Sequence, residues 1–163
     1  MEIVFVASLL VAYIIAFCIR NKTIPASLSE AVYDMPTVCT WAWTICMTLI
    51  TAIGGTFLIA HVSNIALVFA IVACVGMLAL AFNPQDKMKT PLGLKMHNIE
   101  ARVTAVSSQL ILLADKPVLL LTWIPWVVVY WIMRTFGHEW ERRTLAAELI
   151  CFGTIIAFCM SFL

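Results

Sequence analysis

Apolar residues occur in six long runs along the chain, and short polar segments separate these runs. A helix crosses the hydrocarbon core of a bilayer with about 20 mainly apolar residues, within a range of about 17–25. The runs approach this length and predict an all-α fold: one domain over residues 1–163, a polytopic bundle of six transmembrane helices. The predicted spans are residues 3–19, 38–60, 65–82, 98–114, 118–133 and 145–163.

Turn and helix-breaking residues fit this division. Only residues 61–64 separate the second run from the third, and so short a turn predicts an antiparallel helical hairpin. Pro117 stands at the expected first turn of the fifth helix, whereas Pro125 is expected to kink that helix because it removes a backbone donor. Gly54 and Gly55 in the second run predict the close approach of a neighbouring helix or a local kink.

The fourth run is the most polar of the six, because it holds Glu100, Arg102 and Gln109. If it only lay along the membrane surface, the chain would cross five times. Basic residues decide between the two topologies, since the cytoplasmic loops of membrane proteins are enriched in lysine and arginine. Eight of the ten basic residues fall in three loops that six crossings place on one side: Arg20, Lys22, Lys87, Lys89, Lys95, Arg134, Arg142 and Arg143.

Six crossings are therefore favoured, with the basic loops in the cytoplasm and both termini on the non-cytoplasmic side. Five crossings would move one basic loop to the opposite side. The first run begins with Met1 and Glu2 instead of basic residues and lacks a small-residue cleavage site, so we expect a permanent span and not a signal peptide. The expected location is a cell membrane, a bacterial inner membrane before any other.

Composition agrees with a membrane location. Of the residues, 63% are hydrophobic and 12% are charged, with a mean hydropathy of +1.02. Soluble domains have about 45–50% apolar and about 25% charged residues. The net charge of +1 gives no reason to expect a nucleic-acid partner. The expected partners are membrane lipids, a second copy of the chain or another membrane protein, and no cofactor is expected.

The six cysteines all lie inside apolar runs, and no two of them form a C-x-x-C pair. A free thiol in apolar surroundings behaves as a small hydrophobe. We therefore expect these residues to pack in the bundle and not to form disulfides or a zinc site. They are Cys18, Cys39, Cys46, Cys74, Cys151 and Cys159.

The fourth run also carries most of the polar residues that a bilayer disfavours. At about 100° per residue, Thr104, Ser107 and Ser108 share one side of the helix with His97 and Glu100. One interpretation is a polar path or a ligand-contacting wall. The alternative is that these hydroxyls bond back to their own helix or strengthen helix packing.

A second polar stripe of Arg102, Gln109 and Lys116 repeats every seven residues on the opposite side of this helix. Two polar stripes cannot both face lipid, so we expect the fourth helix to be central, with protein or water along both. Arg102 lies at the predicted depth of Glu148 in the sixth run and of Glu100. We predict a structural ion pair, Arg102–Glu148 or Arg102–Glu100.

Catalytic candidates gather at the cytoplasmic ends of the predicted helices. Topology places Ser27, Asp34, Asp86, His97 and Glu100 in the same leaflet region. A histidine with several carboxylates could bind a metal or act as a base on a lipid headgroup. No H-x-x-x-H, H-E-x-x-H or nucleophile elbow supports this, and Ser27 fits a helix cap as well. No metal site is predicted, and His97 is the weak candidate for one.

Two cytoplasmic segments carry a resemblance to known proteins. The first reads Ile24-Pro25-x-Ser27-Leu28-Ser29, and the second is a short loop ending in Met96-His97-Asn98. This arrangement resembles small multi-pass proteins common in Bacteroidetes and their phages. Phe82, Asp86, His97 and Ala101 resemble, more faintly, the six-helix DRAM/Frag/Sfk-type membrane proteins. The resemblance implies six membrane helices and supplies no catalytic residues.

Three functions remain open from the sequence. The first is a membrane protein without catalysis that binds lipid or another membrane protein through its bundle. The second is an oligomeric transporter or channel subunit with a polar path along the fourth span. The third is a membrane-embedded hydrolase acting on lipid headgroups at the cytoplasmic leaflet. The lack of any specific catalytic motif favours the first.

Overall fold

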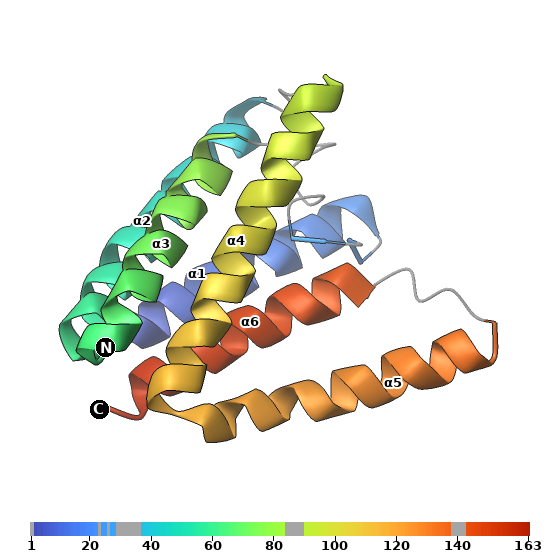
Figure 1. Ribbon diagram of the computed structural model, residues 1–163. Helices are drawn as coiled ribbons and strands as arrows, with labels where there is room; N and C mark the ends of the chain where they lie inside the picture. The colour runs from blue at the N-terminus through green and yellow to red at the C-terminus, as the bar shows by residue number, and fades with distance from the viewer. Residues whose placement is uncertain (1, 23, 26, 29–36, 84–89, 138–142) are drawn as a thin grey trace.

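The computed structural model describes residues 2–22, 24–25, 27–28, 37–83, 90–137 and 143–163, and regular structure in these residues is entirely helical. The predicted all-α class and six helices are confirmed (Figure 1). A six-residue 3-10 helix, η3, precedes the fifth α-helix. The elements are α1 (Glu2–Asn21), α2 (Thr37–His61), α3 (Asn64–Phe82), α4 (Pro91–Asp115), η3 (Pro117–Thr122), α5 (Trp123–Thr135) and α6 (Arg143–Met160).

The predicted hairpin of the second and third helices is present, but α4 begins at Pro91, seven residues before its predicted span. A cap sets this boundary: the side chain of Thr90 accepts a hydrogen bond from the N–H of Gly93 at 3.1 Å, and Pro91 occupies the first turn. The sequence-based span counted only residues suited to the bilayer. Figure 1 shows that the added turns extend beyond the end of α3.

The fifth helix is irregular at its start and not, as predicted, in its middle. Pro117 starts η3 as expected for a helix start, and the backbone changes from 3-10 to α geometry at Thr122. Pro125 therefore lies in the first turn of α5 and not in mid-helix. Since the first turn of a helix leaves its N–H groups without intrahelical partners, the missing donor of proline costs little there.

Five helices form a closed ring, and α5 lies outside it. α1 contacts α2, α2 contacts α3, α3 contacts α4, α4 contacts α6, and α6 contacts α1. α5 packs against α6 and η3, and none of its thirteen residues, all described, is buried. The picture agrees, with α5 set apart along the outer side of α6 (Figure 1). The ring, and not the full set of helices, therefore defines the interior.

The closest packing in the ring joins α3 to α4. The buried residues of α3 are small, and Ala66 and Ala70 have no exposed surface. A Cβ atom on Gly76 would overlap the hydroxyl oxygen of Thr104. Small residues let helices approach closely in a membrane, where van der Waals packing drives association. On α2, a Cβ on Gly55 would lie 2.7 Å from Cys74 Sγ, which confirms a close approach there.

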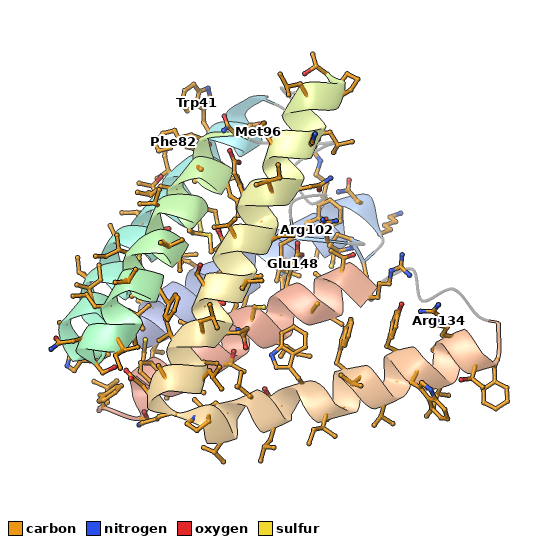
Figure 2. The ribbon with its side chains drawn as sticks, in the orientation of Figure 1. Trp41, Phe82, Met96, Arg102, Arg134 and Glu148 are labelled. Atoms are coloured by element: carbon orange, nitrogen blue, oxygen red, sulfur yellow. The ribbon has the colours of Figure 1, made fainter. Side chains whose placement is uncertain are left out.

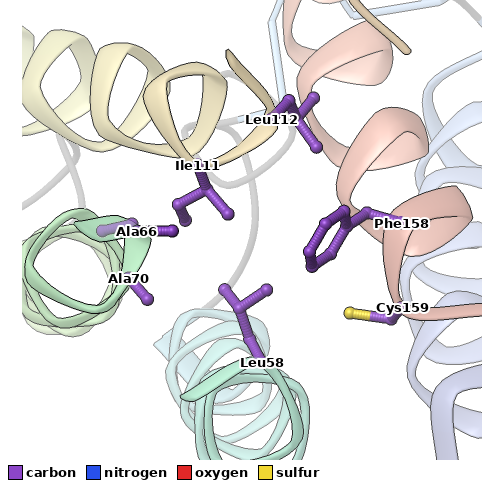
Figure 3. Close-up of a cluster of buried hydrophobic side chains, with 8 residues drawn as sticks. Leu58, Ala66, Ala70, Ile111, Leu112, Phe158 and Cys159 are labelled. Carbon is purple, nitrogen blue, oxygen red and sulfur yellow. The ribbon is translucent and has the colours of Figure 1, made fainter. Parts of the chain in front are cut away.

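Two apolar clusters hold the ring at its two ends. Figure 3 shows the first, in which Ile111 of α4 lies between the alanines of α3 and the buried Phe158 of α6. The second joins α1, α2, α3 and α6 with Leu28 of the first loop. The first cluster comprises Leu58, Ala66, Ala70, Ala73, Ile111, Leu112, Phe158 and Cys159, and the second comprises Leu10, Leu28, Trp43, Met47, Ile50, Ala81 and Leu145.

Polar contacts tie three segments together at the end of the bundle where the chain terminates. The carboxylate of Asp115 accepts hydrogen bonds from the backbone N–H and the hydroxyl of Ser63, at 2.9 and 2.5 Å. Lys116 donates to the hydroxyl of Ser161 and lies 4.4 Å from the ring centre of Phe162. The turns after α2 and α4 and the chain end are thus joined by ionic and aromatic contacts.

Four helical segments are long and apolar enough to cross a membrane: Thr40–His61, Asn64–Phe82, Pro117–Thr135 and Arg143–Met160. The described side chains of α1 add a shorter apolar segment, Ser8–Asn21. α4 has the length but not the hydropathy, because of its polar stripes. The cysteines whose side chains are described, Cys18, Cys46, Cys74, Cys151 and Cys159, are unpaired thiols.

We predict that Gly76→Ala destabilises the bundle, because its methyl group would overlap Thr104. Overpacking of this kind costs about 1–3 kcal/mol. Thermal unfolding of the purified protein in detergent measures the effect. Gly153→Ala is the matched control, since a Cβ at Gly153 meets no atom within 4 Å.

The double variant Gly76→Ala/Thr104→Ala tests the cause. It removes the hydroxyl that the new methyl group meets, so it should recover most of the lost stability. Equal midpoints for Gly76→Ala and Gly153→Ala would contradict close packing of α3 on α4.

Candidate functional site

A cavity of about 410 Å³ lies inside the ring. Small-molecule sites in proteins measure about 300–1,000 Å³, so this volume is that of a ligand site. All five ring helices contribute to its wall, together with Leu28 of the first loop and Trp123 at the start of α5. Most of the wall is apolar, including Met47, Leu58, Met77, Phe152 and Ile155. Such a wall offers water few partners and suits hydrocarbon.

Gly54 and Gly55 of α2 both line the cavity, but their surroundings differ. Gly55 allows the contact with Cys74 on α3, as described above. A Cβ at Gly54 would meet no atom within 4 Å, so this residue leaves room inside the ring. Gly55 therefore allows α2 to pack closely on α3, and Gly54 leaves space in the cavity.

Three residues with ionisable side chains line the cavity, from two helices. His97 and Arg102 come from α4, and Glu148 comes from α6. Figure 2 shows Arg102 and Glu148 on the same side of the bundle, toward the end at which α6 begins. At the other end of the cavity the wall is apolar, with Leu58 near the last turn of α2 and Cys159 near the last turn of α6. The residues with ionisable side chains thus line the cavity toward one end, while nearly all of its surface is apolar.

His97 is buried, with 4% of its surface exposed, and it contacts the end of α3. Its Nδ1 lies 3.3 Å from the backbone oxygen of Asn83. The side-chain amide of Asn83 donates to Glu100 at 3.2 Å, while the other carboxylate oxygen of Glu100 is buried with no hydrogen-bond partner. These contacts join the end of α3 to α4 and give His97 and Glu100 a structural role.

The catalytic constellation is placed only in part. Asp34 and Asp86 lie outside the described residues, and so does Ser29. Ser27 is described in the first loop, half-buried, and does not line the cavity. Within the described residues, no three side chains of His, Cys, Asp or Glu are grouped so as to hold a metal ion.

The hydroxyl stripe of α4 divides between the cavity and the helix interface. Thr104 and Ser108 line the cavity, whereas Ser107 is buried away from it. Ser108 donates to the carbonyl of Ala105 at 2.7 Å, which satisfies its hydroxyl within the helix. The hydroxyl of Thr104 is buried beside Gly76 and has no hydrogen-bond partner. The stripe is therefore partly packing and partly cavity wall.

The second stripe of α4 has partners among the later elements. Gln109 accepts a hydrogen bond from the indole N–H of Trp123 at 2.8 Å, and Lys116 binds Ser161 as described above. α4 thus contacts α3 on one side and η3 and α6 on the other. Gln109 and Lys116 of this stripe thus contact protein, whereas Arg102 is exposed.

Glu148 contacts a backbone group that sequence analysis did not identify. Its carboxylate accepts a hydrogen bond from the N–H of Leu28 at 2.6 Å. Leu28 is 4% exposed, and Pro25 before it is also buried, so this part of the first loop folds into the bundle. The available signal was an apolar residue between Ser27 and Ser29 in a polar loop. The ion pair of Glu148 with Arg102 stays a prediction, although both residues line one cavity.

Comparisons with known proteins bear on neither the resemblance nor the function. The chain matches no protein-family model, and no curated protein or solved structure is significantly similar to it. The resemblance carried by the first loop therefore stays a prediction. Of the described residues of this loop, Pro25 and Leu28 are buried, and Leu28 lines the cavity.

Proposed function

We propose that this chain is an integral protein of a cell membrane, a bacterial inner membrane, that crosses the bilayer six times and binds a lipid inside its bundle without catalysis. The cavity carries this proposal, because it combines an apolar wall with ionisable groups toward one end. An amphipathic molecule has the same division, and membrane lipids are the amphipathic molecules that surround such a bundle.

Exposed apolar surface supports the membrane location. The outer side of α3 presents Ile65, Val68 and Val75, each more than 60% exposed. The opposite side of the same helix is buried in the ring. Soluble proteins rarely expose contiguous apolar surface of this kind, whereas hydrocarbon chains cover it without cost. Surfaces such as this one on α3 are expected to face lipid.

The helix order supports six crossings with both termini outside. Figure 1 shows α1 beginning and α6 ending on the same side of the bundle. Basic residues stand near the opposite ends of the helices, as Arg20 does in α1, Lys95 in α4, Arg134 in α5 and Arg143 in α6. The positive-inside rule assigns this end to the cytoplasm. The charged part of the cavity then lies toward the cytoplasmic leaflet.

The cavity supports lipid binding more than transport or hydrolysis. A transport path along α4 would need its hydroxyls to line one passage, but Ser107 lies outside the cavity and Thr104 faces Gly76. Hydrolysis through a metal would need a ligand set around His97, but no three side chains of His, Cys, Asp or Glu among the described residues are grouped to hold a metal ion. Neither alternative has a specific contact in its favour among the described residues.

The topology can be tested with single cysteines introduced at the two ends. A membrane-impermeant maleimide should label Leu163→Cys in intact cells, because this exposed residue is predicted to lie outside. Lys22→Cys, also exposed, should be labelled only after the membrane is permeabilised. Native cysteines lie in the apolar runs, so the unmodified protein serves as the background control. The reverse pattern, or equal labelling in intact cells, would contradict the topology.

Lipid binding can be tested by filling the cavity. Gly54→Leu places a side chain in the open space beside α2, and it should lower the lipid retained by the purified protein at least about tenfold. Gly153→Leu is the matched control, because this glycine also has open space around it but does not line the cavity. Native mass spectrometry counts the retained lipid. Absence of lipid from the unmodified protein, or equal retention by both variants, would refute the proposal.

A further inference from the structure

The cavity opens to the outside between α4 and α6. Among the described residues of its wall, the exposed ones are Arg102 of α4 and Thr144 of α6, whereas the wall residues of α1, α2 and α3 are buried or half-buried. α4 and α6 meet at the apolar cluster of Ile111 and Phe158 and diverge from there toward the end at which α6 begins (Figure 1). The opening is therefore in the side of the ring, where these two helices separate.

α5 runs beside this opening and has one inward face. The half-buried residues of α5 are Trp123, Trp126, Tyr130 and Met133, and its other residues are exposed. Spacings of three and four residues place these side chains on one face of a helix. The rings of Trp123 and Trp126 meet edge to face with their centres 5.6 Å apart, and Trp126 stacks on Tyr130 at 5.2 Å. The face that α5 turns toward protein is therefore a continuous aromatic row.

Two indole hydrogen bonds attach this aromatic row to the two helices that flank the opening. Trp123 lines the cavity, and its N–H donates to the side-chain oxygen of Gln109 on α4 at 2.8 Å. The N–H of Trp126 donates to the backbone oxygen of Arg143 at 3.2 Å. Arg143 is the first residue of α6 and precedes the exposed Thr144. The row thus bridges α4 and α6 at the place where the wall of the cavity is interrupted.

We infer that α5 is a lateral lid, through which a lipid passes between the bilayer and the cavity. In the closed position, the indoles of Trp123 and Trp126 hold α5 against α4 and α6. Movement of α5 away from the ring breaks the two hydrogen bonds and opens the side of the cavity to surrounding hydrocarbon. α5 serves as such a lid only if the bundle binds a lipid as proposed above.

The packing of α5 permits this movement. None of its residues is buried, whereas each of the five ring helices contributes buried residues to an apolar cluster. Moving α5 therefore leaves both clusters and the α3–α4 contact in place. Its outer residues, among them Val127 and Val128, are apolar and exposed, so they face hydrocarbon in either position. Segments with few buried contacts open locally at low free energy while the core stays folded.

The release rate of bound lipid tests the lid in the full-length protein. Lipid retained on purification is chased in detergent with an excess of chain-deuterated phosphatidylethanolamine and phosphatidylglycerol, and native mass spectrometry follows its loss. Gln109→Leu removes the acceptor of the Trp123 N–H, and Trp123→Phe removes the donor. Each should speed release about fivefold, the factor expected for the loss of one hydrogen bond of ordinary strength. Trp131→Phe is the matched control on the same helix, since Trp131 is 66% exposed and does not line the cavity.

Two further measurements separate a lid from a contact that only stabilises the bound lipid. A lid changes the rates of entry and release by the same factor, so the amount of lipid bound at equilibrium should not change in Gln109→Leu, a residue outside the cavity wall. The double variant Gln109→Leu/Trp123→Phe should release lipid no faster than either single variant, because either substitution already breaks the bond. Faster release with an equal fall in the bound amount, or additive effects, would overturn the inference.

The outcomes also separate the lid from the proposed function. If the unmodified protein retains no lipid, lipid binding is refuted and the lid is refuted with it. If lipid is retained but Gln109→Leu and Trp123→Phe release it at the rate of Trp131→Phe, α5 is a fixed part of the bundle and only the lid is refuted.

Discussion

The structure depends on the close contact between α3 and α4. α4 is too polar to face lipid, and it is held in the ring because α3 presents a row of small residues to it. Gly76 allows the backbone of α3 to approach Thr104, and Ile111 packs on Ala66 and Ala70. This contact places Arg102 on the cavity side of the helix. Without it, the ring would lack the helix that supplies most of its polar groups.

The same contact explains how α4 can carry two polar stripes within the bundle. The stripe that contains His97 contacts α3, in part through the backbone of Asn83. The other stripe contains Arg102, which lines the cavity, and Gln109, which binds Trp123. Polar residues inside a membrane protein must meet protein, water or ligand, because lipid offers no hydrogen bonds. α4 meets this requirement on both sides.

Much of the helical architecture was predictable from the sequence, because apolar runs of bilayer length dictate helices whatever their packing. The start of α4 was not predicted, because the cap at Thr90 lies among polar residues. The 3-10 helix η3 was not predicted either, because local hydropathy does not distinguish 3-10 from α geometry. His97, Arg102 and Glu148 stood out as polar groups in apolar runs. The bond from Leu28 to Glu148 was not predictable, since it joins residues 120 positions apart.

The burial of Leu28 also joins the first loop to the sixth helix by two interactions of different kinds. Its side chain is buried against the cavity, and its N–H donates to Glu148 of α6. Exposing a buried leucine costs about 1.5–3 kcal/mol, and a hydrogen bond contributes about 0.5–1.5 kcal/mol more. Displacing Leu28 would break both interactions at once, so this part of the loop and the start of α6 are expected to unfold together.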